Sequence, residues 1–157
     1  MKFVPFYFCM AFVFLLLPHG TEASDIRGER GEAVDIVNKV VIYFEKNGEE
    51  ETLKAVTEKS NPEFFKKDLY PFIYDLKGVN VAHGAKPHLV GKPLLELKDK
   101  DGVFLIREMV ELAKQGKTGW VNYKWPDPAT NSVTDKSSYI SPLGDKYFVG
   151  VGVYLAQ

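Results

Sequence analysis

Hydrophobic residues after Glu32 recur at the spacing of an amphipathic helix. They return every three or four positions, which places them on one helical face. The repeating positions are Ala33, Ile36, Val37, Val40, Val41 and Phe44. Asn47 and Gly48 tolerate the left-handed conformation that ends many helices, and the apolar pattern resumes over residues 49–59. The pattern predicts a long helix from Glu32 that ends or is interrupted at Gly48.

A second helical pattern covers residues 101–115. Its apolar row consists of Val103, Ile106, Val110 and Ala113. Asp99 or Asp101 is placed to cap the start of this helix, and Gly116 is placed to end it.

Shorter runs that contain β-branched and aromatic residues predict strands. Tyr70–Tyr74 and Val79–Ala82 flank Asp75–Gly78, whose glycine suits a tight turn, so the three segments predict a β-hairpin. Turn residues separate three further predicted strands, over residues 118–125, 133–141 and 146–154. Five strands and two helices in this order indicate an α+β fold with an antiparallel sheet, whose last three strands are consecutive neighbours.

The first residues have the pattern of a secretory signal peptide. Lys2 precedes an apolar run over residues 3–17, and small residues stand at the −3 and −1 positions of a cleavage site after Ala23. The alternative is an uncleaved anchor, but the run is shorter than the ~20 residues of a spanning helix. We therefore predict a signal peptide over residues 1–23 and a single ligand-binding domain over residues 24–157.

Composition excludes several classes of function. A net charge of −1 argues against nucleic-acid binding, which needs clustered Lys and Arg. The one cysteine, Cys9, lies in the predicted signal peptide, so the mature chain has no thiol nucleophile, disulfide or cysteine metal site. His83 and His88 alone are a weak metal signal. We predict no cofactor, no metal and no catalytic residue. The enzymatic alternative is a hydrolase built from Ser137 or Ser138, His83 and an aspartate.

Several segments together resemble a known family. Residues 70–92 read Y-P-F-I-Y-D-L-K-G-V-N-V-A-H-G-A-K-P-H-L-V-G-K, and F-L-I-R-E-M-V-E-L-A-K, G-W-V-N-Y-K-W-P, K-S-S-Y-I and Y-F-V-G-V-G-V-Y follow in order. Their order and spacing resemble the single Cache domain, an extracytoplasmic, PAS-like sensor module, over residues 30–154. The resemblance implies a PAS-like sheet with the long N-terminal helix along its back. It also implies small ligands, often short carboxylates.

The predicted ligand site combines aromatic and cationic residues. Its members are Tyr74, His83, Tyr123, Trp125, Lys136 and Tyr139. The aromatic members each carry a polar atom that needs a partner when buried, although ordinary sheet core is the alternative for such residues. Lys136 and Tyr139 match a K-x-x-Y site motif of the family. On an ideal strand these two residues point to opposite faces, so both line one pocket only through a bulge or at the start of the strand.

Two of the predicted site residues have structural alternatives. His83 offers one hydrogen-bond donor and one acceptor to a ligand, or it holds the loop over residues 84–91 through backbone hydrogen bonds. Lys136 offers a positive charge to a carboxylate, or it lies on the surface. Gly150 and Gly152 leave a notch on one strand face, which admits a ligand or a closely packed helix.

The function that follows is an exported sensor module, periplasmic or extracellular, that binds a small carboxylate. Cache receptors continue into a second membrane helix and a transmitter region, and the sequence stops at Gln157. We therefore expect a stand-alone module that signals through a membrane sensor kinase or receptor, with a possible homodimer through the N-terminal helix. The non-enzymatic alternative is an interaction protein that docks such a receptor without a ligand of its own.

Overall fold

The long predicted helix is present and bends at Gly48. The structure is a computed structural model that describes residues 26–155, so the predicted signal peptide lies outside the described part of the chain. Helix α1 spans Arg30–Thr57, and Glu29 and Glu32 form a capping box at its start. Gly48 has a positive φ of 82°, and the hydroxyl of Thr52 donates to its carbonyl oxygen at 2.7 Å. The prediction of an interruption at Gly48 is confirmed.

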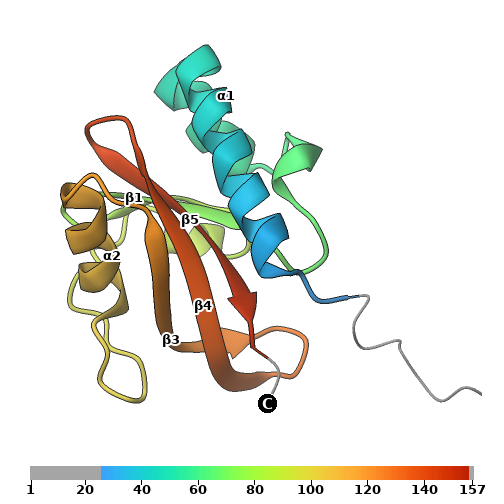
Figure 1. Ribbon diagram of the computed structural model, residues 1–157, viewed down its shortest axis with the longest axis vertical. Helices are drawn as coiled ribbons and strands as arrows, with labels where there is room; N and C mark the ends of the chain where they lie inside the picture. The colour runs from blue at the N-terminus through green and yellow to red at the C-terminus, as the bar shows by residue number, and fades with distance from the viewer. Residues whose placement is uncertain (1–25, 156–157) are drawn as a thin grey trace, which may run out of the picture.

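The strands form one antiparallel sheet in the order β2-β1-β5-β4-β3 (Figure 1). Its strands are β1 (Pro71–Asp75), β2 (Asn80–His83), β3 (Gly119–Asp127), β4 (Ser132–Leu143) and β5 (Tyr147–Tyr154), and the short 3-10 helices η1 (Pro62–Phe64) and η2 (Pro87–Leu89) lie in the connections. The last strand of the chain is therefore the central strand of the sheet. The predicted α+β fold with five antiparallel strands is confirmed.

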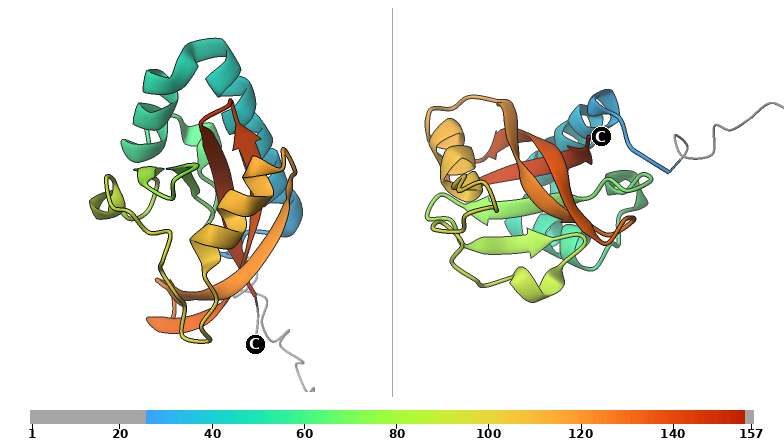
Figure 2. Two further views of the ribbon diagram at one scale, coloured as in Figure 1. Left: turned by 90° about the vertical axis from the view of Figure 1, so that its left-hand side faces the viewer. Right: turned by 90° about the horizontal axis from the view of Figure 1, so that it is seen from below.

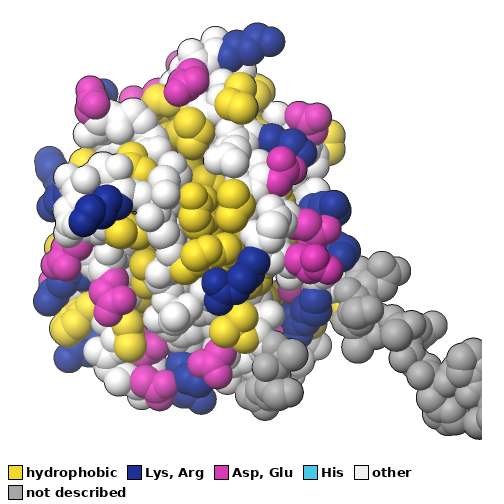
Figure 3. Space-filling model, viewed as in Figure 1, with side chains coloured by type: hydrophobic (Ala, Val, Ile, Leu, Met, Phe, Trp, Pro, Cys, Tyr) yellow, Lys and Arg dark blue, Asp and Glu magenta, His cyan; other side chains and the backbone are white. Residues whose placement is uncertain are grey.

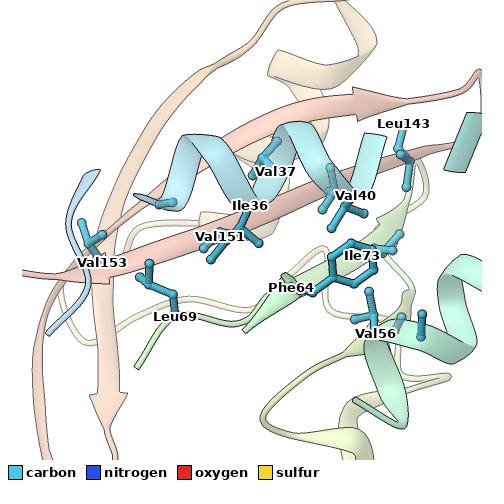
Figure 4. Packing of buried hydrophobic residues seen from close by; sticks show 14 residues of the cluster. Ile36, Val37, Val40, Val56, Phe64, Leu69, Ile73, Leu143, Val151 and Val153 are labelled. Atoms are coloured by element: carbon cyan, nitrogen blue, oxygen red, sulfur yellow. The ribbon is translucent and has the colours of Figure 1, made fainter. Parts of the chain in front are cut away.

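Helix α1 covers one face of this sheet (Figures 1 and 4). Aliphatic side chains of α1 and of the central strands meet in a buried cluster that includes Ile36, Val37, Val40, Ile73, Leu143, Val149 and Val151. Complete burial of such a side chain stabilises the fold by about 1.5–3 kcal/mol. This cluster fixes α1 on the sheet and leaves the opposite face to other elements.

Helix α2 (Leu105–Lys114) packs on the opposite face (Figure 2). The cluster beneath it contains Phe72, Tyr74, Leu105, Ile106, Met109, Val110, Val121, Tyr123, Ile140 and Phe148. The helix ends as predicted before Gly116, which has a φ of 65°. Helices α1 and α2 thus cover opposite faces of the sheet.

The predicted start and cap of α2 are wrong. The helix begins at Leu105, and its N-cap residue, Phe104, makes no side-chain cap. The carboxylate of Asp99 instead accepts backbone N–H groups of Asp101 and Val103, each at 2.9 Å. Its second oxygen accepts the N–H of Lys124 in β3 at 2.8 Å. Asp99 therefore closes a turn and connects this turn to β3. The helix begins only after the turn, at Leu105.

Part of the sheet beside α1 stays open to solvent. Figure 3 shows a strip of hydrophobic side chains between α1 and β4, with charged side chains around it. Trp120 and Tyr139 are half-buried here, and their ring centres are 5.4 Å apart. Arg30 lies over the Trp120 ring, 4.4 Å from its centre.

Within residues 26–155, no helix has the length and apolar character that a membrane crossing requires.

Candidate functional site

A small cavity lies between the sheet and α2, and we call it the inner cavity. Strands β1 to β4 and helix α2 supply its walls, which consist of Tyr70, Phe72, Tyr74, His83, Leu105, Ile106, Met109, Tyr123, Trp125 and Lys136. Its volume is about 10 Å³. That is about the smallest cavity volume that can hold one water molecule. The walls therefore nearly touch in this conformation.

Lys136 supplies the positive charge of the inner cavity. Its side chain is 1% exposed. The Nζ atom donates to the hydroxyl of Tyr70 at 2.7 Å, and it lies 4.2 Å from the ring centre of Tyr70 and 4.4 Å from that of Tyr154. Burial lowers the pKa of Lys136. The alternative of a surface lysine is therefore excluded.

Lys136 reaches Tyr70 by crossing a strand. Lys136 is in β4 and Tyr70 immediately precedes β1, while β5 lies between these strands. The side chain passes over Gly152 of β5, where an added Cβ would overlap Lys136 Cε and Ser138 Oγ. At Gly150 an added Cβ would overlap the ring of Phe72. The notch is therefore filled by side chains of the sheet itself, and both predicted occupants, a ligand and a helix, are wrong.

A chain of hydroxyl groups continues from Lys136 to the edge of the site. The hydroxyls of Tyr70 and Tyr154 are 3.3 Å apart, and Tyr154 donates to the carbonyl oxygen of Pro126 at 3.0 Å. Burial opposes ionisation of Tyr70, but the charge and the hydrogen bond of Lys136 outweigh it, so the pKa of Tyr70 is lowered. Neither tyrosine was among the predicted site residues. The signal for Tyr70 was its position on the same strand face as Phe72 and Tyr74.

His83 lines the inner cavity and also holds the following loop. Its Nδ1 atom accepts the backbone N–H groups of Ala85 at 3.2 Å and Lys86 at 3.0 Å. The proton of the neutral ring is therefore on Nε2. Burial, together with the charges of Lys136 and Lys86, lowers the pKa of His83 to about 3. Both predicted roles are thus compatible, because the ring keeps an N–H donor while it holds the loop.

Three aromatic residues complete the predicted set. The Tyr74 ring stacks on Phe148 with centres 5.6 Å apart, and burial raises the pKa of Tyr74 to about 12. The hydroxyls of Tyr123 and Ser138 are 2.7 Å apart and hydrogen bonded. Trp125 stands edge-on to Tyr123, with ring centres 6.0 Å apart. These rings stay uncharged at neutral pH and form an apolar wall with few free polar atoms.

Tyr139 does not lie in the inner cavity. It is on the α1 side of the sheet, beside Trp120. Strand β4 pairs with β5 in continuous register from Lys136 to Leu143, so there is no bulge to change the alternation of side chains. The structure therefore brings together Tyr74, His83, Tyr123, Trp125 and Lys136, and leaves Tyr139 on the opposite face.

The groups of the alternative hydrolase do not meet. Ser137 donates to the amide oxygen of Asn122 at 2.6 Å, and Ser138 is hydrogen bonded to Tyr123. In the described part of the chain neither hydroxyl is hydrogen bonded to His83. The same residues contain no group of three or more His, Cys, Asp or Glu arranged to hold a metal ion. The arrangement suits binding of a small anion by a buried cation in an aromatic cage.

A model of the Cache domain family matches residues 22–157. The chain belongs to the Cache domain family. Two curated relatives of this Cache domain are signalling proteins. The sensor histidine kinase MctS of Rhizobium johnstonii is 42% identical over 91 residues, which are 57% of this chain and 19% of the kinase. The methyl-accepting chemotaxis protein McpP of Pseudomonas putida is 40% identical over 91 residues, which are 56% of this chain and 16% of the receptor.

Solved structures share the fold of this Cache domain. A methyl-accepting chemotaxis protein from Vibrio parahaemolyticus superimposes with a TM-score of 0.63 at 29% identity, covering 80% of this chain and 87% of that one. A Cache chemosensory domain studied for carboxylic acid recognition gives a TM-score of 0.60 at 26% identity, covering 80% and 88%. The chain is thus homologous to the sensor domains of chemoreceptors and histidine kinases, and it spans less than a fifth of the two curated relatives.

Proposed function

We propose that this Cache domain binds a short monocarboxylate in the inner cavity, with the carboxylate on Lys136. The observation that supports this most strongly is the buried charge itself. Within residues 26–155, Lys136 has no carboxylate in salt-bridge contact. A buried ammonium without an anionic partner is costly to the fold. A ligand carboxylate supplies the missing charge, and the Nε2–H of His83 offers it a further hydrogen bond.

The walls of the inner cavity limit the rest of the ligand. Its ten lining residues include one lysine and no Asp or Glu, and Phe72, Leu105, Ile106 and Met109 supply apolar walls. A second carboxylate would lack a cation there, and the ammonium of an amino acid would lack an anion. We therefore propose acetate, propionate and pyruvate as the ligand class, and not dicarboxylates or amino acids.

We further propose that the domain senses this ligand after export, in the periplasm or outside the cell, and signals through a membrane kinase or receptor. The homology to sensor domains of such proteins supports this. A homodimer through α1 is supported by Ile42, whose side chain on this helix is 63% exposed. The competing function, docking without a ligand, would use the hydrophobic strip beside α1. It gives no reason for burying the charge of Lys136.

Ligand-dependent thermal unfolding tests the proposal. Purified protein is heated with acetate, propionate, pyruvate, succinate or glycine. A ligand at ~100 times its dissociation constant stabilises the folded state by ~2.7 kcal/mol. We expect stabilisation by the monocarboxylates alone, and its loss in Lys136→Met. Lys92→Met is the matched control, because Lys92 is exposed and lies outside the inner cavity. Equal stabilisation of Lys136→Met, or none of the wild type by any monocarboxylate, would overturn the assignment.

A further inference from the structure

A second cavity adjoins the inner one at the surface, and we call it the outer cavity. Its volume is about 250 Å³. Tyr70 lines both cavities, and Tyr154 and Lys86 also line the outer one. The hydroxyls of Tyr70 and Tyr154, which connect to Lys136, therefore stand between the two spaces. An anion in the outer cavity is separated from Lys136 by these side chains.

We infer that the outer cavity is the entrance to the carboxylate site, and that Lys86 draws the anion in and closes the inner cavity behind it. The inference rests on the proposed function for the identity of the ligand. Lys86 lies between the two spaces, since it lines the outer cavity while its Nζ atom lies 4.7 Å from the ring centre of Trp125, a wall of the inner one. Its backbone N–H is held by His83.

The segment that carries Lys86 lines the outer cavity and is joined to two walls of the inner cavity, His83 and Trp125. We call residues 85–90 the flap. Its first end is held by His83 Nδ1, and just beyond its second end the N–H of Gly91 donates to the carbonyl oxygen of Asn80 at 2.8 Å. Between these anchors the side chain of Val90 is 41% exposed. The walls of the inner cavity itself are paired strands and a helix with a buried apolar face. The flap can therefore move without disrupting the sheet.

The charges around the outer cavity favour an anion. Its carboxylate is Asp127, which the guanidinium of Arg27 pairs through two hydrogen bonds, Nη2 to Oδ2 at 2.6 Å and Nη1 to Oδ1 at 3.1 Å. The Arg27 guanidinium holds the pKa of Asp127 below its usual value. Lys86 is then the uncompensated charge of the lining. Such a charge raises the rate at which an oppositely charged ligand arrives.

The rate of ligand association tests the role of Lys86. Acetate, propionate and pyruvate are mixed with the purified protein in a stopped-flow instrument, and tryptophan fluorescence is followed. In Lys86→Met we expect the association rate constant to fall roughly fivefold at low ionic strength, because steering by charge is lost. The difference should disappear near 1 M salt, where the Debye length is ~3 Å. The dissociation rate constant should rise, because the cation–π interaction with Trp125 is lost. Lys92→Met should match the wild type in both rates.

Two outcomes of this experiment separate the entrance from the site. If Lys86→Met binds with wild-type rate constants at low salt, the proposed role of Lys86 at the entrance is wrong, while the proposed carboxylate site on Lys136 is unaffected. If no monocarboxylate binds the wild type, the proposed function is wrong. A second measurement then tests whether Lys86 attracts anions to the entrance.

That second measurement is fluorescence quenching of Trp125 in a Trp120→Phe background, with iodide as a small anion and acrylamide as a neutral probe. In Lys86→Met we expect the ratio of iodide to acrylamide quenching to fall, because the positive charge beside the Trp125 ring is lost. An unchanged ratio would show that Lys86 does not attract anions to Trp125, and the inference would be wrong.

Discussion

Lys136 and Tyr70 are joined by a 2.7 Å hydrogen bond that spans the central strand of the sheet. The contact connects the fourth strand of the chain to the start of the first, and it passes over Gly152. A residue at the centre of the fold thus brings one charge into an otherwise apolar and aromatic cavity. The same buried charge destabilises the unligated protein and provides the attraction for a ligand carboxylate.

Lys136→Met should make the unligated protein more stable. Methionine keeps the unbranched shape of the lysine stem and removes a buried ammonium that has no acidic partner. Replacing buried charged groups by apolar ones of similar size is often neutral or stabilising, by about 1–4 kcal/mol. Urea unfolding at neutral pH measures the change. A clear loss of stability would show that Tyr70 and the two aromatic rings already compensate the charge.

Gly152→Ala should disturb the same contact from the opposite side. The added methyl group overlaps Lys136 and Ser138, so the lysine must leave its path. Overpacking of this kind costs about 1–3 kcal/mol. Loss of a hydrogen bond to a charged group weakens binding by roughly 10–100-fold, which calorimetry with propionate would detect.

The control for that experiment is Gly31→Ala. Gly31 lies near the start of α1, and an added Cβ there meets no atom within 4 Å. Both stability and binding should be preserved. If Gly152→Ala behaves like this control, the path of Lys136 over β5 is wrong.

Much of the fold could be predicted from local patterns. The apolar stripe after Glu32 predicted α1, and the alternating segments predicted five strands, because both signals depend on neighbours in the sequence. The start of α2 could not be predicted this way. Asp99 has the sequence position of a cap, but Lys124, 25 residues later, donates to its carboxylate. A contact with strand β3 thus gives Asp99 a role in a turn, and not the role of a helix cap.

The site was predictable only in part, for the same reason. Alternation along β4 already placed Lys136 and Tyr139 on opposite faces, and the structure follows this alternation. Tyr154 and Tyr70 become partners of Lys136 through the order of strands β1, β5 and β4, which single-strand patterns do not contain. Residues that are near each other only in the folded sheet leave no signal in single-strand patterns, and the K-x-x-Y motif does not predict the face on which Tyr139 lies.

Two tyrosine variants test this assignment of faces. Tyr139→Phe should leave the affinity for propionate within about twofold of wild type, because its hydroxyl is on the α1 side. Tyr154→Phe removes the group between Tyr70 and the Pro126 carbonyl. We expect a loss of about fivefold in affinity, equivalent to ~1 kcal/mol for one hydrogen bond. The reverse order of effects would return Tyr139 to the site.

His83 should make stability depend on pH between about 3 and 6.5. Its pKa falls from 6.5 to about 3 in the folded protein, so between these values the unfolded chain binds a proton that the folded chain does not. Stability therefore rises with pH in this window, by at most about 1.4 kcal/mol per pH unit for one group. The contribution is complete above pH 6.5 and is lost as the pH falls toward 3. Urea unfolding at a series of pH values measures it.

The variant His83→Asn separates the contribution of His83 to the pH dependence of stability from that of the carboxylates, which also titrate at low pH. The amide oxygen of asparagine can accept the N–H groups of Ala85 and Lys86 as Nδ1 does, but the side chain has no proton to gain. The variant should lose slope most clearly between about pH 5 and 6.5, where most carboxylates are already ionised. His88→Asn, at an exposed histidine five residues away, should keep the wild-type slope. If the two variants have the same pH dependence, His83 is not held neutral by its burial beside Lys136.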